Sequence, residues 1–510
     1  MMDGFSKKEY LSLTMPTNET PVSDQRRIEL ALEVLGYSPV VFPLSVLRKL
    51  YPLCREADFN ITVSLCHREN DWVVTQIEAG DTTGYHYGLA VDYGSTTIVM
   101  QLVDMISGAV IGQESVVNGQ VQYGTDILTR ITYVLEDKKR WKDLQLATVQ
   151  TFHQLFELLT DATGIDAAKC PAMVISGNTT MIHFLLGLDA WTVFADPFAP
   201  VTVDPGFFCG TELGMDFEGQ VYIVPAASNY VGGDIVSGLL VTDIHNKDEV
   251  NLFFDIGTNG ELVLGCREWL VAGAGAAGPA LEGYISKYGM RAAPGAIDHV
   301  KIEDGKLSFT TIGSERPVGI CGSGIIDLLA YMRRSGWINM AGQLEPSASD
   351  RIEMIDGEYV AVYATGEESA LGVPLYFSQT DIDQYLDTKA AAFTMVDCIL
   401  EIAGITEADI SKLYLSGAFP AYSDLESAIT IGMFPDLQRE KFELLKNSSL
   451  QGARIILSDH SKLMEAKALS ERIYCVQFAS VPDFLVRMQA AKFIPHTDKN
   501  RFPSVQLYFS

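Results

Sequence analysis

Apolar runs alternate along the chain with segments in which apolar residues recur at helical spacing. Residues 87–117 contain three apolar or alternating runs separated by tight turns, and this pattern predicts three consecutive strands. Residues 126–136 and 144–160 follow as predicted helices, the second with apolar side chains on one face, and residues 173–177 as a further strand. A second cycle of this kind begins at Val250. Strands and helices in this order favour a mixed α/β fold.

The same pattern divides the chain into five parts. Residues 1–25 are polar and contain two prolines, which is typical of an extended arm. Residues 26–86 combine two helical segments with a hairpin and predict a small α/β domain. Residues 87–248 and 249–495 are expected to form two related lobes, and residues 496–510 a C-terminal tail.

One short pattern occurs once in each predicted lobe. An apolar strand ends in Asp, one residue, Gly and a hydroxyl residue, at 92–97 (DYGSTT) and again at 255–260 (DIGTNG). The glycine allows a sharp turn whose amides face an anion, and carboxylate oxygens are ligands that Mg²⁺ prefers. Each copy alone is also explained by a carboxylate that caps a turn. Together the two copies predict lobes that bind one phosphate chain in a cleft.

Composition excludes several classes of protein. The 510 residues are 47% hydrophobic and 20% charged, so the chain is globular rather than disordered. A formal net charge of −28 argues against binding to duplex nucleic acid, whose affinity comes largely from Lys and Arg. No apolar run reaches membrane-spanning length and the N-terminus does not resemble a secretory signal, so we expect a cytoplasmic protein without a membrane partner.

The eight cysteines are scattered along the chain. Their spacing matches neither a zinc site nor an iron–sulfur site of the common types. We therefore expect reduced, buried thiols and no iron–sulfur cluster in this chain.

Five longer motifs restrict the families that the chain can resemble. They lie at 176–183 (SGNTTMIH), 225–235 (PAASNYVGGDI), 277–283 (AGPALEG), 289–297 (GMRAAPGAI) and 319–324 (GICGSG). The two Asp loops resemble the phosphate loops of the superfamily that contains actin, heat-shock ATPases, and the acetate and sugar kinases (ASKHA). With the longer motifs included, the chain resembles the reductive activators of corrinoid proteins from about residue 25 to residue 490.

This resemblance implies a fold and a function. The fold is a two-lobed actin-like ATPase with ribonuclease-H-like duplicated lobes and a small N-terminal α/β domain. ATP with Mg²⁺ is the expected ligand, and hydrolysis remodels a corrinoid protein of a methyltransferase system while its Co(II) is reduced to Co(I). Members usually carry an iron–sulfur domain that this sequence lacks, so the electrons are expected from a separate ferredoxin-like protein. A homodimer is also expected for activators of this kind.

The resemblance also implies site residues. Asp92 and Asp255 are assigned to catalysis and to Mg²⁺, directly or through water. The residues expected to contact the nucleotide are Gly94, Ser95, Thr96, Thr97, Gly257, Thr258, Asn259, Gly278, Glu282, Gly322, Ser323, Gly324, Lys389, Gly417 and Ala418. Ala418 stands where the family usually has a second glycine close to the adenosine. The glycines at 278, 322 and 324 are explained almost equally well by close helix–strand packing, Glu282 by a salt bridge, and Lys389 by a solvated position.

Two other functions stay open at this point. A small-molecule kinase of the same superfamily shares both phosphate loops, but it needs a catalytic Asp directed at a substrate hydroxyl, and the sequence does not single one out. A non-enzymatic nucleotide-binding or partner-binding protein is the third hypothesis, favoured by Ala418 and by the missing iron–sulfur domain. Phosphate release measured with and without a corrinoid protein distinguishes the three.

Overall fold

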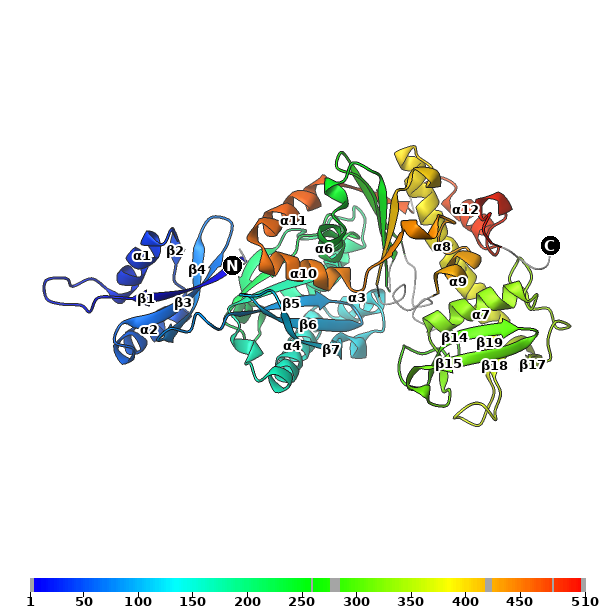
Figure 1. The fold of residues 1–510 in the computed structure, drawn as a ribbon, viewed down its shortest axis with the longest axis horizontal. Coiled ribbons are helices and arrows are strands. Elements are labelled where there is room, and N and C mark those ends of the chain that lie inside the picture. The colour runs from blue at the N-terminus through cyan, green and yellow to red at the C-terminus, as the bar shows by residue number, and fades with distance from the viewer. Residues whose placement is uncertain (1–3, 258–259, 276–284, 418–423, 479–480, 506–510) are drawn as a thin grey trace. The chain divides into compact units, whose positions relative to one another are not determined.

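The computed structural model describes residues 4–257, 260–275, 285–417, 424–478 and 481–505. The chain forms two compact units, drawn together in Figure 1. Unit 1 comprises Met1–Val241 and Ser448–Arg472, and unit 2 comprises Thr242–Asn447 and Ile473–Ser510. Each unit is a mixed α/β structure, as the sequence predicts.

The first part of unit 1 is a small α/β module with sheet order β1-β3-β4-β2. Its elements are β1 (Ser6–Ser12), α1 (Asp24–Val34), β2 (Val40–Val41), α2 (Leu44–Glu56), β3 (Asn60–His67) and β4 (Trp72–Ala79). The sequence predicts an extended arm over residues 1–25, whereas residues 6–12 pair antiparallel with β3 as an edge strand. Arg27 is 8% exposed and donates hydrogen bonds to the carbonyls of Thr14, Thr20 and Val22, which fixes the loop between β1 and α1.

The remainder of unit 1 surrounds a six-stranded sheet of order β7-β6-β5-β8-β10-β9. Its strands are β5 (Tyr87–Tyr93), β6 (Thr97–Asp104), β7 (Val110–Val117), β8 (Ala172–Gly177), β9 (Gly206–Cys209) and β10 (Gln220–Ile223). Its helices are α3 (Ile127–Glu136), α4 (Trp141–Thr163), α5 (Thr179–Leu186), α6 (Gly233–Thr242), α10 (Ser448–Ser458) and α11 (His460–Arg472). Leu89, Ala90 and Val91 of β5 are fully buried, which explains the continuous apolar run before Asp92.

Unit 2 contains a second six-stranded sheet, of order β21-β20-β11-β12-β13-β22. Its strands are β11 (Asn251–Ile256), β12 (Gly260–Gly265), β13 (Leu270–Gly275), β20 (Lys412–Ser416), β21 (Phe442–Leu444) and β22 (Ile473–Gln477). Two three-stranded sheets accompany it, one from β14 (Ala296–Glu303), β15 (Lys306–Thr311) and β16 (Gly319–Ile320), the other from β17 (Ile352–Ile355), β18 (Glu358–Ala364) and β19 (Leu375–Ser378).

The two six-stranded sheets repeat one arrangement. β5 and β11 each have an antiparallel neighbour on one side (β6 or β12) and a parallel neighbour on the other (β8 or β20). The next strands are again antiparallel on the first side (β7 or β13) and parallel on the second (β10 or β21). The duplication predicted from the Asp loops is therefore confirmed, and it extends over five strands of each sheet.

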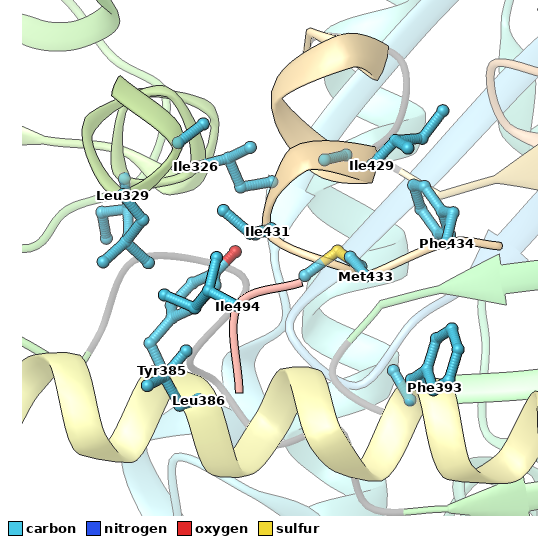
Figure 2. Packing of buried hydrophobic residues seen from close by; sticks show 14 of the residues in the cluster. Ile326, Leu329, Tyr385, Leu386, Phe393, Ile429, Ile431, Met433, Phe434 and Ile494 are labelled. Atoms are coloured by element: carbon cyan, nitrogen blue, oxygen red, sulfur yellow. The ribbon is translucent and has the colours of Figure 1, made fainter. Parts of the chain in front are cut away.

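The helices of unit 2 enclose its apolar core. They are α7 (Gly322–Arg334), α8 (Gln379–Ala403), α9 (Leu425–Thr430) and α12 (Phe484–Ala491). Figure 2 shows Tyr385 and Leu386 of α8 on one side of Ile494, with Ile326 and Leu329 of α7 on the other. Phe502 is 3% exposed and Arg501 pairs with Asp397 of α8, so the described part of the predicted C-terminal tail is packed on this helix.

Helices α10 and α11 belong to a different unit from the one that the sequence predicts. The sequence predicts one lobe over residues 249–495, but Ser448–Arg472 belongs to unit 1. The reason is the apolar face of α10, where Ala453, Ile456 and Leu457 are fully buried. This helix lies against β5 and β8, and Figure 1 shows it beside β5. Among the described residues of both units, no helix combines the length and the apolar composition needed to cross a membrane.

Candidate functional site

The first Asp loop leaves the sheet of unit 1 at the end of β5. Asp92 is the penultimate residue of that strand, is half-buried, and lies in register with Ser176 of β8. A Cβ at Gly94 would lie 2.5 Å from the carbonyl oxygen of Thr97, so only glycine fits this turn. Residues 94–97 are partly exposed.

Asn118 fixes this loop, and our sequence analysis did not single it out. It directly follows β7 and is fully buried. Its Nδ2 donates to the Gly94 carbonyl at 2.9 Å, and its backbone N–H donates to the Thr96 carbonyl at 2.9 Å. The Asn-Gly pair at 118–119, directly after the third predicted strand, is the signal that marked a turn there.

We predict that Asn118→Ala loosens the loop. Loss of the side-chain hydrogen bond leaves the Gly94 carbonyl without that donor, and amide hydrogen exchange in residues 93–98 should become about tenfold faster. Hydrogen exchange followed by mass spectrometry measures this effect. Gln122→Ala is the matched control, since Gln122 lies in the same segment and donates to Gly119 instead. Equal exchange in the two variants would assign the loop's order to other contacts.

A buried polar network supports the base of the loop. The Tyr93 hydroxyl lies 2.8 Å from Thr148 Oγ1 and accepts a hydrogen bond from Gln120 Nε2 at 3.2 Å. Arg130 is fully buried and donates from Nη1 to Gln120 Oε1 at 3.3 Å. Burial raises the pKa of Tyr93, so the hydroxyl keeps its proton, and burial lowers the pKa of Arg130. Such a network holds Tyr93, and with it the neighbouring Asp92, in one position.

The second Asp loop has the corresponding place in unit 2. Asp255 is the penultimate residue of β11, is half-buried, and lies in register with Ser416 of β20. Gly257 follows the strand and is partly exposed. Thr258 and Asn259 lie outside the described residues.

The same dipeptide, Ser-Gly, stands at the end of the strand beside each Asp: β8 ends in residues 176–177, and β20 ends at Ser416 with Gly417 directly after it. A Cβ on the first of these glycines would lie 2.8 Å from the Tyr93 carbonyl oxygen. The second glycine has φ +105°, and a Cβ there would overlap the Ile256 carbonyl oxygen. Tyr93 and Ile256 each follow the Asp of their loop directly. Gly417, a predicted nucleotide contact, therefore packs against the backbone of the second Asp loop.

The predicted residues at the start of α7 are buried. Gly322, Ser323 and Gly324 form the first turn of the helix. A Cβ on Gly324 would lie 2.5 Å from the Ile297 carbonyl oxygen, which favours the packing explanation for this glycine. The other predicted contacts in unit 2, Gly278, Glu282 and Ala418, lie outside the described residues.

Lys389 does not have the position that the sequence analysis expects. It is fully buried on α8, and its ammonium group donates to the carbonyls of Ala491 (2.5 Å), Phe493 (2.7 Å) and Pro495 (2.6 Å). These three bonds use all three of its hydrogens. Lys389 therefore fastens the C-terminal segment to α8, and neither a solvated position nor a nucleotide contact describes it.

The motifs at 176–183 and 225–235 meet in unit 1. A Cβ on Gly232 would lie 2.5 Å from Asn178 Cα, so the start of α6 packs against the start of α5. The Asn178 side chain accepts from the Met181 N–H at 2.9 Å and is the N-cap of α5. His183 is fully buried, its Nε2 accepts from the Val201 N–H at 3.1 Å, and burial lowers its pKa. It is thus a neutral core histidine.

Three family models match the chain in succession. They are described as the RACo linker region, over residues 1–84, the RACo middle region, over residues 87–247, and the C-terminal domain of RACo, the ASKHA domain, over residues 249–506. The last match alone covers half of the chain.

Individual proteins that activate or reduce corrinoid proteins are also similar to this chain. The corrinoid activation enzyme RamQ of Eubacterium limosum is 30% identical over 411 residues, which cover 78% of this chain and 69% of that protein. A [Co(II) methylated amine-specific corrinoid protein] reductase of Methanosarcina barkeri is 26% identical over 276 residues, or 50% of this chain and 47% of that protein. A solved structure of a reductive activator for a corrinoid, iron–sulfur protein is 35% identical with a TM-score of 0.90, and the match covers 99% of this chain and 81% of that one.

Proposed function

The chain belongs to the RACo family, and from that premise we propose that it is a cytoplasmic ATPase that reductively activates corrinoid proteins. Its substrate is a corrinoid protein of a methyltransferase system whose cobalt has been oxidised to Co(II). One electron from a separate ferredoxin-like protein reduces the Co(II) to Co(I), and ATP hydrolysis remodels the corrinoid protein for this step. The observation that carries the proposal is the repeated arrangement of Asp, glycine turn and Ser-Gly strand end in the two units.

The nucleotide is proposed to bind to both Asp loops. Residues 94–97 supply amide and hydroxyl donors to phosphate oxygens, and so do Gly257 and, on sequence alone, Thr258 and Asn259. The proposed contacts for the remainder of the nucleotide are Gly278, Glu282, residues 322–324 and residues 417–418.

Asp92 and Asp255 are the proposed Mg²⁺ ligands, directly or through water. Carboxylate oxygens fit a hard cation, and both side chains are only half-buried at the ends of their strands. Magnesium, when bound, neutralises charge on the phosphate oxygens. The two carboxylates orient the attacking water, and the glycine turns let the backbone approach the phosphates closely.

A separate electron donor is proposed from the spacing of the cysteines. The eight are scattered along the chain, and their spacing matches no common iron–sulfur site. None of them forms a disulfide, and six are buried.

ATP assists the electron transfer only if its binding favours one state of the partner. The ATP-bound form must prefer the corrinoid protein in the state whose Co(II) is easier to reduce. Hydrolysis then returns the activator to the form with lower preference.

Phosphate release and cobalt absorption test the proposal together. The full chain is mixed with Mg-ATP, a chemical one-electron donor and the Co(II) form of a methylated-amine-specific corrinoid protein or another methyltransferase corrinoid protein. The expected result is hydrolysis stimulated at least severalfold by the Co(II) form, together with the absorption spectrum of Co(I). The methylated form of the same corrinoid protein is the matched control and should not stimulate hydrolysis.

Other outcomes would replace the proposal. ATP turnover that requires a sugar or an organic acid would indicate a small-molecule kinase. Binding of Mg-ATP without turnover under any of these conditions would indicate a nucleotide-binding partner protein. The expected homodimer is tested separately by light scattering during size-exclusion chromatography.

A further inference from the structure

Unit 1 contains a line of hydroxyl groups that ends on Asp92. Ser449 of α10 donates a hydrogen bond of 2.8 Å from Oγ to Asp92 Oδ1. Ser449 Oγ also lies 3.0 Å from Ser176 Oγ of β8, and Ser176 Oγ lies 2.9 Å from Ser237 Oγ of α6. Ser449 is 5% exposed and the other two serines are fully buried. The line thus joins three separate stretches of chain to the first Asp loop.

Packing of the backbone fixes this line. Ser176 is in register with Asp92 on the neighbouring parallel strand. Helix α10 lies against β5 and β8, and Figure 1 shows it beside β5. A Cβ on Gly452 of α10 would lie 2.5 Å from Ser237 Cβ, so α10 also approaches α6 as closely as a glycine permits. Ser449 therefore reaches Asp92 from a rigid helix rather than from a loop.

The position of Ser449 along the chain is also informative. The chain leaves unit 1 after Val241 and returns to it at Ser448. Ser449 is the second residue after this return, and the residues before it, up to Asn447, belong to unit 2. The hydrogen bond to Asp92 is therefore made at the point where the chain re-enters unit 1.

We propose that Ser449 is a positioning residue for Asp92. Because a carboxylate oxygen only accepts, the Ser449 proton points to Asp92 and fixes one of its oxygens. The carboxylate is then held in one orientation, and this orientation depends on the position of α10. Ser176 holds Ser449 in place, whereas the Ser237 hydroxyl contacts Ser176 and not Ser449. This inference rests on the proposed function, in which Asp92 binds Mg²⁺ with ATP.

Magnesium dependence separates this role from a purely structural one. The full-length Ser449→Ala chain is compared with wild type in Mg²⁺ titrations of two signals, binding of a fluorescent ATP analogue and phosphate release. We expect the Mg²⁺ concentration for half-maximal signal to rise about tenfold and kcat to fall by a similar factor, because a hydrogen bond to a charged group is lost. Binding of the analogue in EDTA should stay within about twofold of wild type.

Two further variants keep the result interpretable. Ser449→Thr retains the hydroxyl and should restore most of the wild-type Mg²⁺ dependence. Ser449→Cys keeps nearly the same volume with a much weaker donor, so it tests the hydrogen bond even where the alanine lowers stability. The matched control is Ser237→Ala, which removes a buried hydroxyl from the other end of the line and should leave the Mg²⁺ dependence within about twofold.

The outcomes distinguish the two proposals. Equal Mg²⁺ dependence in the Ser449→Ala, Ser449→Cys and Ser237→Ala chains would overturn the role of Ser449 and leave the proposed function intact. A wild-type chain that binds Mg-ATP without hydrolysing it would overturn the ATPase, and the binding titration would still decide on Ser449. Absence of Mg²⁺-dependent binding in wild type would overturn both.

Discussion

Asp92→Asn and Asp255→Asn are each expected to lower corrinoid-stimulated ATP hydrolysis by about 100-fold or more. Each substitution keeps the size of the side chain and removes a negative charge that the proposed site uses to hold Mg²⁺. Metal ions supply several kcal/mol of transition-state stabilisation in phosphate chemistry, and about 1.4 kcal/mol corresponds to tenfold in rate. Phosphate release at saturating ATP measures the loss, and excess Mg²⁺ should recover part of it if metal affinity is what has fallen.

One matched control lies on β6 beside the start of β5, and the other lies shortly before β11. Asp104 ends β6 beside Tyr87, the first residue of β5, and Asp248 precedes β11 and pairs with Arg267 at 3.3 Å. Asn at either position changes the net charge by the same amount as the test variants, and hydrolysis should stay within about twofold of wild type. If Asp92→Asn or Asp255→Asn hydrolyses ATP as fast as these controls, that carboxylate is not a metal ligand.

The fold was largely predictable because its signals are local. The apolar runs before Asp92 and Asp255 are buried central strands, and the three-strand units that contain them are joined by short turns. Such elements leave their pattern in consecutive residues. The duplication of the Asp loops then indicated two related sheets, and the strand orders confirm it.

The contacts that support the first loop were not predictable, because they join residues that lie far apart in the sequence. Asn118 and Ser449 each reach the loop from another element, and Ser449 is 357 residues from Asp92 in the chain. Neither residue belongs to a motif whose spacing indicates its target. The return of α10 to unit 1 could not be predicted from the sequence either. An apolar helix face predicts that the helix is buried, but it does not identify the sheet against which the helix packs.

The position of Lys389 was predicted wrongly, because its residue type alone does not reveal its surroundings in the fold. A lysine on a helix is usually solvated, and the resemblance placed this one at the nucleotide. In the structure the helix is central to unit 2, and the chain returns at residues 491–495 to present three carbonyls to the ammonium group. Burial lowers the pKa of Lys389, and the carbonyl oxygens are the groups that favour its charged form.

Lys389→Met is therefore expected to be among the most destabilising substitutions in unit 2. Methionine fills a similar volume but leaves three carbonyls without their donor. At about 1–3 kcal/mol for each unsatisfied buried group, the loss in the free energy of unfolding is about 3–6 kcal/mol, allowing for partial relaxation. Hydrogen exchange in α8 and in residues 491–495 should rise first, because these are the two segments that the ammonium group joins.

Lys492→Met provides the comparison for this loss. Lys492 also connects the C-terminal segment to α8, through an ion pair with Asp387, but both side chains are partly exposed. Its removal should cost about 1 kcal/mol or less, because exposed ion pairs contribute little. Equal stability of the two methionine variants would mean that the three carbonyls find other donors. At a temperature where the Lys389→Met chain is still folded, its affinity for ATP should match wild type, and a selective loss of affinity would return Lys389 to the nucleotide site.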